Sequence, residues 1–291
     1  MLNINSYAKL NLSLEVIGKF DDGYHEIKSI MQTIDIYDSL EFYPSNNINI
    51  NVIGNHIPIQ NNLVYKAVMY LKNLYLVKEG INIKIVKNIP IASGLGGGSG
   101  NAANTILALN KIWNLNLTFE EMTSLAIKLG SDVPYFLYQG TALVEGKGEK
   151  VTKLLDINIR DILIISPNSK IISSKTEKMF NYLTEDNYSD GYITDNLIKK
   201  INNRSVISNS EIHNVFNNIS FESYKFMKDL LNNLNKLGIS KFNICGSGPS
   251  IFMIIDDKKI IDKLKNDKYF NSYKVFLVKS NKGISEIKYD N

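Results

Sequence analysis

Apolar and polar residues alternate along much of the first 87 residues, with the period of two that is typical of β-strands. The alternation is clearest over residues 10–16 and 48–52, and an Asp-Asp-Gly turn at 21–23 breaks it. A helical spacing over residues 63–76 interrupts the strands. We therefore expect a sheet with one intervening helix in this part of the chain.

Helical patterns dominate the next part of the chain. Residues 101–113 have helical spacing directly after a glycine-rich loop, and a second helix begins at a capping box that starts with Thr118. We expect that helix to end at Gly130 as a left-handed C-cap. A short helix is predicted within residues 131–140, followed by a strand at 141–144.

The second half of the chain alternates strands and helices. Strands are expected at residues 162–165, 251–255 and 275–278. Helices are expected at residues 174–183, 195–201, 223–237 and 258–265. This pattern indicates an α+β protein, and the length together with the break near residues 150–160 predicts two domains, 1–155 and 156–291.

Composition narrows the class of protein. The chain has 44% hydrophobic and 21% charged residues, as globular proteins do, and its mild net charge of +4 with scattered lysines disfavours a nucleic-acid binder. The single cysteine, Cys245, cannot form an internal disulfide and is insufficient for a zinc cage with three scattered histidines. Residues 1–7 lack the features of a targeting peptide, and no apolar run could cross a bilayer. We therefore expect a cytoplasmic protein without a membrane partner.

The most informative segment is Ile89–Ala103, in which five glycines occupy seven consecutive positions ahead of a helical pattern. Glycine destabilises a fold unless its freedom to take positive φ or to approach a ligand is used. A flexible turn would explain an isolated glycine pair, but apolar residues bracket this loop on both sides, which favours a packed loop. Unpaired N–H groups and the dipole at the N-terminus of the following helix attract anions. The sequence therefore predicts a phosphate-binding loop.

Three well-known phosphate-binding motifs do not fit this loop. A Walker loop requires Gly-Lys-Ser/Thr, but Gly100 follows Ser99 and no lysine occurs between Lys87 and Lys111. A dinucleotide-binding fingerprint requires Gly or Ala at the position of Ser99, and about 20 residues later a strand that ends in an acidic residue. This chain has a serine at that position, and a helical pattern over residues 101–113 follows it. The His-Arg-Asp and Asp-Phe-Gly tripeptides of protein kinases are both absent. A fourth kind of loop is required.

Each of the other candidate residues, taken alone, has both a functional and a purely structural explanation. Asp132, just beyond a glycine-ended helix, has a simpler explanation as a helix-start carboxylate, and Lys9 as an ordinary exposed lysine on a strand. The segment Gly23–Glu26 is a turn with an aromatic and a titratable ring. In Cys245–Ser250, a tight connection and a close approach to a ligand explain the two glycines equally well.

The order of these segments resembles that of the GHMP family of small-molecule kinases over nearly the whole chain. The segments that carry the resemblance are Ala8–Leu12, Asp22–Glu26, Gly94–Ser99, Gly130–Phe136 and Gly246–Gly248. Within the family they are similar to the branch whose acceptor is a cytidine-diphosphate-linked methylerythritol, and Asp22–Glu26 is the most specific match. Three positions depart from the pattern: Gly100 replaces a serine, Ser93 a glycine or alanine, and Tyr7 a proline.

The resemblance implies a two-domain GHMP kinase fold. Its N-terminal β/α domain has a left-handed βαβ crossover, and its C-terminal domain is a ferredoxin-like α/β domain. The implied activity is ATP-dependent phosphorylation of the 2-hydroxyl of the cytidine-diphosphate-linked methylerythritol, in non-mevalonate isoprenoid biosynthesis. ATP and Mg²⁺ are the implied cofactors.

The resemblance also implies roles for residues on the side of the phosphate donor. Asp132 would accept the hydroxyl proton as general base, and Lys9 would keep that carboxylate ionised and offset charge on the transferred group. Ser99 is the implied magnesium ligand. The implied ATP-binding residues are Pro90, Ile91, Ala92, Ser93, Gly94, Leu95, Gly96, Gly97, Gly98, Ser99 and Gly100, the last through its backbone only.

On the acceptor side, the resemblance implies that Tyr24 and Phe180 stack on the cytosine while His25 reads its hydrogen-bonding edge. Asn11 would lie near the methylerythritol. Phe180 has an equally good alternative as a core aromatic beside Met179. The expected partner is therefore this small-molecule substrate, and we expect a monomer or a weak homodimer.

Three other functions stay open at this point. The first is another GHMP kinase, acting on homoserine, mevalonate or a sugar, which Tyr24 and His25 disfavour because those substrates have no base to stack. The second is a catalytically silent ligand sensor, which the presence of Lys9 and Asp132 disfavours. The third is an RNA-binding protein that shares the crossover domain of this family.

Overall fold

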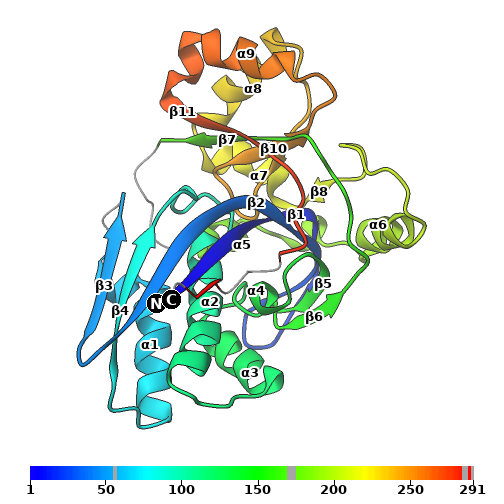
Figure 1. Cartoon of the computed structure of the whole chain (residues 1–291). Coiled ribbons are helices and arrows are strands. Elements are labelled where there is room, and N and C mark those ends of the chain that lie inside the picture. Colours follow the sequence, from blue (N-terminus) through cyan, green and yellow to red (C-terminus); the bar gives the residue numbers. More distant parts are fainter. Residues whose placement is uncertain (55–57, 169–174, 284–287, 290–291) are drawn as a thin grey trace.

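The computed structural model describes residues 1–54, 58–168, 175–283 and 288–289. Within these residues it contains two sheets, each with its own helices, and the predicted α+β class is confirmed. The two longest strands run across the middle of the molecule, with the first helices below them and the last helices above (Figure 1). None of the helices in the described residues has the length and apolar character that a membrane span requires.

The first sheet is built on a long antiparallel hairpin of β1 (Leu2–Lys19) and β2 (His25–Ser45), joined at the predicted Asp-Asp-Gly turn. Strand β4 (Gly80–Val86) pairs antiparallel with β2, and β3 (Ile48–Ile53) pairs parallel with β4. Helix α1 (Leu63–Leu74) connects β3 to β4, because parallel neighbours need a crossover connection. This is the expected βαβ unit.

Shorter strands complete the first sheet. They are β5 (Thr141–Gly146) beside β2, β6 (Lys150–Lys153) beside β5, and β8 (His213–Asn214) and β12 (Lys288–Tyr289) beside β1. The proposed division of the chain, between residues 155 and 156, lies between β6 and β7 (Ile162–Pro167). Strands β8 and β12 return from the second part of the chain to the first sheet.

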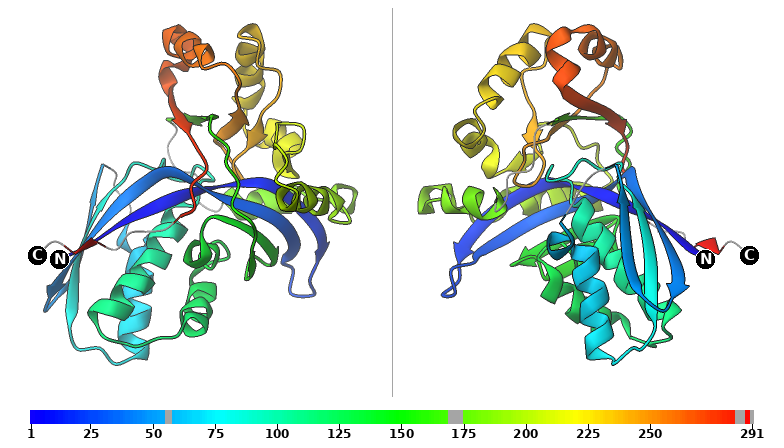
Figure 2. Two further views of the ribbon diagram at one scale, coloured as in Figure 1. Left: turned by 45° about the vertical axis from the view of Figure 1, so that its right-hand side comes forward. Right: turned by 90° about the vertical axis from the view of Figure 1, so that its left-hand side faces the viewer.

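Helices pack against the first sheet on the side away from the second sheet (Figure 2). After η1 (Ile59–Asn61) and α1 come α2 (Gly97–Ile112), α3 (Phe119–Leu129) and α4 (Tyr135–Tyr138). Helix α2 is central, since it contacts α1, α3, α4 and both long strands. Its buried small residues allow this close packing.

Helix α2 begins four residues earlier than its sequence pattern indicates, at Gly97 instead of residue 101. Gly96, with φ 73° and ψ 10°, is the N-cap, and the glycines after it are helical. Glycine has a low helix propensity, so the pattern placed these residues in the loop. Packing of Gly97 against Ile89 and of Gly100 against Phe136 holds them in the helix.

The predicted capping box of α3 is confirmed, since the Thr118 hydroxyl accepts from the N–H of Glu121 and the Glu121 carboxylate accepts from the N–H of Thr118. The helix ends at Leu129, before Gly130, as expected. The predicted left-handed conformation of Gly130 is wrong, because its φ of 159° and ψ of 157° are extended. The chain then enters a turn over residues 131–134 that contains Asp132, in which the N–H of Val133 donates to the carbonyl of Gly130 at 3.1 Å.

The second sheet has four antiparallel strands in the order β11-β7-β10-β9. Besides β7, these strands are β9 (Asn243–Ile244), β10 (Ile251–Ile254) and β11 (Tyr273–Val278). Numbered along this part of the chain, the order is fourth, first, third, second, which is the ferredoxin-like order that the family resemblance implies. The predicted strands at 162–165, 251–255 and 275–278 are confirmed.

The second half of the chain also contributes helices, one of which, α6 (Tyr192–Asn202), contacts β1 and β2 of the first sheet. The other helices are α5 (Lys175–Asn181), η2 (Glu185–Asn187), α7 (Phe216–Ser223), α8 (Met227–Lys236), α9 (Lys259–Asn266) and η3 (Lys268–Ser272). The helix predicted at 223–237 is confirmed as α8 over Met227–Lys236, although it begins four residues later than predicted. Tyr224, with φ −117° and ψ 101°, is extended and separates α8 from α7, which the pattern did not predict.

Strand β1 is buried on both faces over residues 8–16, which explains how polar side chains can be buried in the middle of the molecule. Leu10 and Leu12 pack in one apolar cluster with Ile162 and Ile164 of β7. The opposite face of the same stretch carries Lys9, which is only 3% exposed. The alternation along β1 therefore places this lysine toward α2 and the glycine-rich loop.

Candidate active site

The glycine-rich loop carries the chain from β4 to the N-terminus of α2. The first intrahelical hydrogen bond of α2 runs from the N–H of Gly100 to the carbonyl of Gly96, so the three preceding N–H groups of the helix lie before it. No side chain caps this helix end. The N–H groups of Gly97, Gly98 and Ser99 are thus placed to bind an anion at the positive end of the helix dipole.

Two glycines of the loop are required by close packing. Gly94 has φ 86°, and a Cβ there would overlap the carbonyl oxygen of Cys245. Gly96 has φ 73°, and a Cβ there would lie 2.6 Å from the Phe136 ring and 3.0 Å from Cγ of Lys9. Only glycine combines a positive φ with this lack of space. The loop is therefore pressed against segments that are distant in sequence.

Backbone hydrogen bonds fix the loop in this place. The N–H of Lys9 donates to the carbonyl of Leu95 at 3.0 Å, which ties the loop to β1. The N–H of Ser250 donates to the carbonyl of Ser93 at 3.3 Å, which ties it to the Cys245–Ser250 segment. The loop, β1 and the segment before β10 consequently meet at one point.

Lys9 and Asp132 meet beside this loop. The Lys9 Nζ lies 3.3 Å from Oδ2 of Asp132 and donates a hydrogen bond to Oδ1 of Asn11 at 2.7 Å. The lysine is buried, whereas the Asp132 side chain is 36% exposed and lines the cleft. The structure therefore brings together the two residues expected to take part in catalysis, which are 123 positions apart in the chain.

A chain of hydrogen bonds fixes the orientation of Asn11. The Ser29 hydroxyl donates to the carbonyl of Ser13 at 2.5 Å, so its oxygen is left to accept from Nδ2 of Asn11 at 2.9 Å. The Oδ1 atom of Asn11 must then face Lys9. Asn11 thus holds the ammonium group of Lys9 from one side while Asp132 lies on the other.

Tyr24, His25 and Phe180 gather at the acceptor end. The rings of His25 and Phe180 are stacked, with centroids 5.1 Å apart and an interplanar angle of 27°, and Tyr188 contacts His25 edge-on. Tyr24 is 60% exposed. Burial, and secondarily the nearby Lys19, lowers the pKa of His25 below its usual value, which favours a neutral imidazole at neutral pH.

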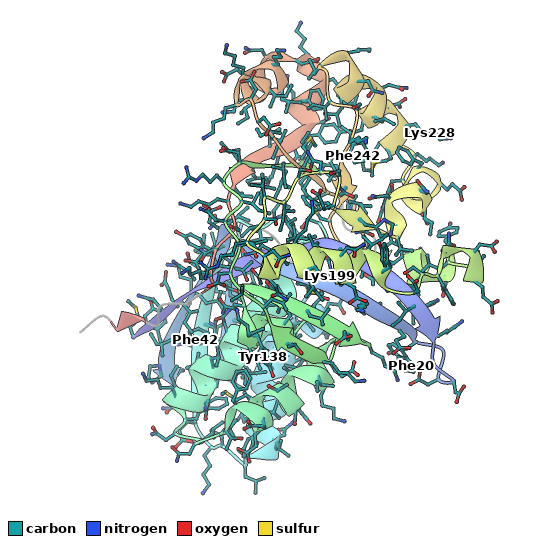
Figure 3. All side chains as sticks on the ribbon, turned by 90° about the vertical axis from the view of Figure 1, so that its right-hand side faces the viewer. Phe20, Phe42, Tyr138, Lys199, Lys228 and Phe242 are labelled. Atoms are coloured by element: carbon teal, nitrogen blue, oxygen red, sulfur yellow. The ribbon has the colours of Figure 1, made fainter. Side chains whose placement is uncertain are left out.

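The turn between β1 and β2 lines this end of the cleft through Asp22, Gly23 and Tyr24. Phe20, in the same turn, lies at one side of the molecule (Figure 3). Lys147, from the turn between β5 and β6, forms an ion pair with Asp22. Its Nζ also lies 5.1 Å from the ring centroid of Phe20 and 5.0 Å from that of Tyr24. The two turns are therefore joined at the rim.

One cleft of about 1040 Å³ connects the two ends of the site. Every candidate site residue lines it except Leu95 and Gly100, which are both buried. A Cβ at Gly100 would lie 3.0 Å from Oγ of Ser6 and 3.2 Å from the Phe136 ring. Those neighbours leave little room for the serine that the family usually has at this position.

The cleft also contains polar residues that the sequence analysis missed, chiefly Asn62, Lys87, Asn101 and Lys147. Asn62 is the N-cap of α1, and its position directly before an apolar helical pattern was a usable signal. Lys87 and Asn101 flank the glycine-rich loop, but their contacts depend on long-range pairing. Lys147 lies in a predicted turn that gave no chemical signal.

Known proteins resemble this chain in both sequence and structure. Two family models match it: the GHMP kinases N terminal domain over residues 62–140 and the GHMP kinases C terminal over residues 197–269. The 4-diphosphocytidyl-2-C-methyl-D-erythritol kinase of Clostridium botulinum (strain Alaska E43 / Type E3) is 39% identical over 281 residues, which are 94% of this chain and 98% of the relative.

Solved structures share the fold. A crystal structure of 4-(cytidine 5'-diphospho)-2C-methyl-D-erythritol kinase has a TM-score of 0.76 at 21% identity, covering 96% of this chain and 99% of that one. The homoserine kinase from Cytophaga hutchinsonii ATCC 33406 has a TM-score of 0.72 at 16% identity, covering 99% and 97%. At these identities the likeness supports the same architecture for all three chains.

Proposed function

This chain belongs to the GHMP kinase family, with 4-diphosphocytidyl-2-C-methyl-D-erythritol kinases as relatives over nearly its whole length, and we propose that it has their activity. The reaction transfers the γ-phosphoryl group of ATP to the 2-hydroxyl of 4-diphosphocytidyl-2-C-methyl-D-erythritol. Its products are ADP and the 2-phosphate. The observation that carries the proposal is the meeting of Lys9 and Asp132 beside a glycine-rich helix N-terminus, within one cleft.

On the donor side, the N–H groups of Gly97, Gly98 and Ser99 would bind phosphate oxygens of ATP. Magnesium that arrives with ATP keeps mostly water and phosphate oxygens as ligands, so one protein oxygen is sufficient. The described residues contain no cluster of three acidic, histidine or cysteine side chains that could hold a metal independently. The Ser99 hydroxyl, in the cleft, fits as that ligand to an ion that neutralises phosphate charge.

On the acceptor side, an aromatic group of residues fits a pyrimidine base. Tyr24 and Phe180 line the cleft, and the neutral imidazole of His25 can donate one hydrogen bond and accept another. Phe180 stacks on His25 in this structure, so the base would have to contact a His25–Phe180 pair or separate it. We propose that Asn11 acts on the acceptor mainly through Lys9.

Phosphoryl transfer requires alignment of the reacting groups and charge neutralisation more than covalent catalysis. The acceptor oxygen bonds to the γ-phosphorus while the bond from that phosphorus to the oxygen of ADP breaks. The hydroxyl proton goes to the carboxylate of Asp132, as general base. The ammonium group of Lys9, 3.3 Å from that carboxylate, offsets negative charge that develops on the transferred group.

All of these groups come from one chain, so we propose that a monomer is sufficient, with at most a weak homodimer. A cytoplasmic location is proposed because ATP is the donor. Kinases of homoserine or mevalonate share the fold, but the aromatic end of this cleft has no evident use for substrates that lack a base.

A substrate panel tests the proposal. The protein is incubated with ATP, magnesium and, separately, the cytidine-diphosphate-linked methylerythritol, homoserine or mevalonate, and ADP release and phosphorus NMR of the product are recorded. We expect phosphorylation of the cytidine compound alone. Transfer to homoserine or mevalonate, with none to the cytidine compound, would refute the proposal.

A further inference from the structure

A carboxylate lies buried behind the glycine-rich loop, outside the cleft. Asp38 of β2 is completely buried, and each of its two carboxylate oxygens accepts two hydrogen bonds. Its Oδ1 accepts from the N–H groups of Asn88 and Ile89, each at 2.9 Å. Its Oδ2 accepts from Nζ of Lys87 and from Nδ2 of Asn101, the latter at 3.0 Å. A buried carboxylate with four donors has its geometry fixed.

These four donors flank the loop on both sides. Lys87, Asn88 and Ile89 follow β4 and lead into the loop, and Asn101 follows the loop in the second turn of α2. One carboxylate thus holds the beginning and the end of the segment that would bind the phosphates of ATP. The backbone N–H groups at its start are set by Oδ1, and the helix is set by Oδ2.

Two of the donors also reach the cleft. Lys87 and Asn101 both line it, although their side chains are only 5% and 3% exposed. The Oδ1 atom of Asn101 has no hydrogen-bond partner among the described residues, so its amide is held from the Nδ2 side alone. Asp38 therefore controls where these side chains stand relative to a bound nucleotide.

We propose that Asp38 is a positioning residue for ATP, acting through Lys87, Asn101 and the two ends of the glycine-rich loop. The inference rests on the proposed function only in taking ATP as the ligand of that loop. Asp38 does not touch the reacting groups, so its loss should weaken nucleotide binding and leave binding of the acceptor unchanged. A residue with a merely structural role would not separate the two substrates in this way.

The test replaces Asp38 by Asn, which keeps the size of the side chain. The amide oxygen of Asp38→Asn can still accept from Asn88 and Ile89, but its NH₂ group would face two donors, Lys87 and Asn101. Asn101 can turn its unpartnered oxygen toward that NH₂ group, which favours a folded variant. Lys87 then loses its partner while buried.

Glu41→Gln is the matched control. Glu41 lies on the same strand, three residues further on, and pairs with Lys84 of β4 at 2.9 Å, with both side chains partly exposed. It has no contact with the loop in the hydrogen bonds of the described residues. The control removes an ion pair between the same two strands without removing an anchor of the loop.

Affinity for ATP is measured without acceptor, by titration calorimetry, and KM for each substrate is measured separately. Asp38→Asn should raise the Kd for ATP by about tenfold or more, the loss expected for an unpaired buried charge-assisted hydrogen bond. The KM of the acceptor should stay within about twofold, and Glu41→Gln should match wild type. An unchanged Kd for ATP in Asp38→Asn, or an equal rise in both KM values, would overturn the inference.

If Asp38→Asn does not fold, the double variant Asp38→Asn with Lys87→Met removes the unpaired buried charge. Lys87→Met alone measures what is lost with the ammonium group, including any effect of Asp38 that acts through Lys87, and a further rise in Kd in the double variant is the effect of Asp38 through Asn101 and the ends of the loop. No further rise would overturn the inference that Asp38 also acts through these groups. Wild-type protein that binds ATP but phosphorylates no alcohol of the panel would refute the proposed function and leave this inference standing.

Discussion

A substitution at Gly98 distinguishes most clearly between a glycine that protein packing requires and a glycine that ligand binding requires. It is exposed in the first turn of α2, it lines the cleft, and its φ is not in the left-handed region. The nearest atom that a Cβ there would meet is Cδ1 of Leu63, at 3.8 Å, an ordinary contact distance. Within the protein itself, alanine therefore fits at this position.

The expected stability of Gly98→Ala follows from helix propensity. Alanine is favoured over glycine in a helix by up to about 1 kcal/mol, and less at a helix end. We expect a thermal midpoint equal to that of wild type or about 3 °C higher. Gly96→Ala is the contrasting variant, because its Cβ would lie 2.6 Å from the Phe136 ring at a φ of 73°, and it should be clearly destabilised.

Nucleotide binding should respond in the opposite sense. If phosphates approach the backbone of Gly98 closely, the added methyl group displaces them, and we expect KM for ATP to rise about tenfold, equivalent to about 1.4 kcal/mol. The assay combines thermal melting with ADP release at varied ATP. Gly98→Ala with wild-type KM for ATP would refute the role of this helix end as the phosphate site.

Three further predictions concern the other end of the reaction and the stability of the fold. Asp132→Asn should lower kcat by about 10²- to 10⁴-fold in steady-state assays while the protein stays folded, and near-normal turnover would remove Asp132 as the base. Ser29→Ala releases the amide of Asn11 and should lower kcat by about fivefold with little change in KM for ATP, whereas Ser29→Thr should retain activity. Equal losses of kcat in both variants would contradict the role of Ser29 in orienting Asn11. Burial lowers the pKa values of His25 and His213 in the folded protein, so the unfolded chain binds protons more readily than the folded one. The contribution of these histidines to the free energy of unfolding should therefore be complete above about pH 6.5 and decrease as the pH falls. Urea unfolding at about pH 7.5 and 5.5 measures this, and equal free energies of unfolding at the two pH values would contradict it.

Local signals in the sequence were sufficient for much of the fold. The alternation along β1, the turn before His25 and the capping box at Thr118 each depend on neighbours within a few positions, and each was predictable. The start of α2 was not, because tertiary packing overrides the low helix propensity of Gly97 and the glycines after it. The break between α7 and α8 at Tyr224 carries neither glycine nor proline and gave no warning.

The candidate site likewise contains residues that local sequence signals predict and residues that they do not. The glycine-rich loop could be recognised from its own residues, whereas Lys9 alone was better explained as an exposed lysine. Its burial follows from the packing of the glycine-rich loop against its face of β1, which no local pattern reveals. The role of Asp38 could not be predicted for the same reason, since its hydrogen-bond donors lie 49 to 63 positions away in the chain. Long-range pairing of strands, not composition, creates these contacts.

The proposed phosphoryl transfer requires that the phosphates of ATP bind at the N-terminus of α2 while the acceptor hydroxyl lies between Asp132 and Lys9. A crystal structure with a non-hydrolysable ATP analogue and the cytidine-diphosphate-linked methylerythritol measures it directly. We predict phosphate oxygens on the N–H groups of Gly97–Ser99 and the 2-hydroxyl oxygen at about 2.6–3.2 Å from the Asp132 carboxylate. Phosphates bound away from that helix end, or an acceptor hydroxyl remote from Asp132, would contradict it.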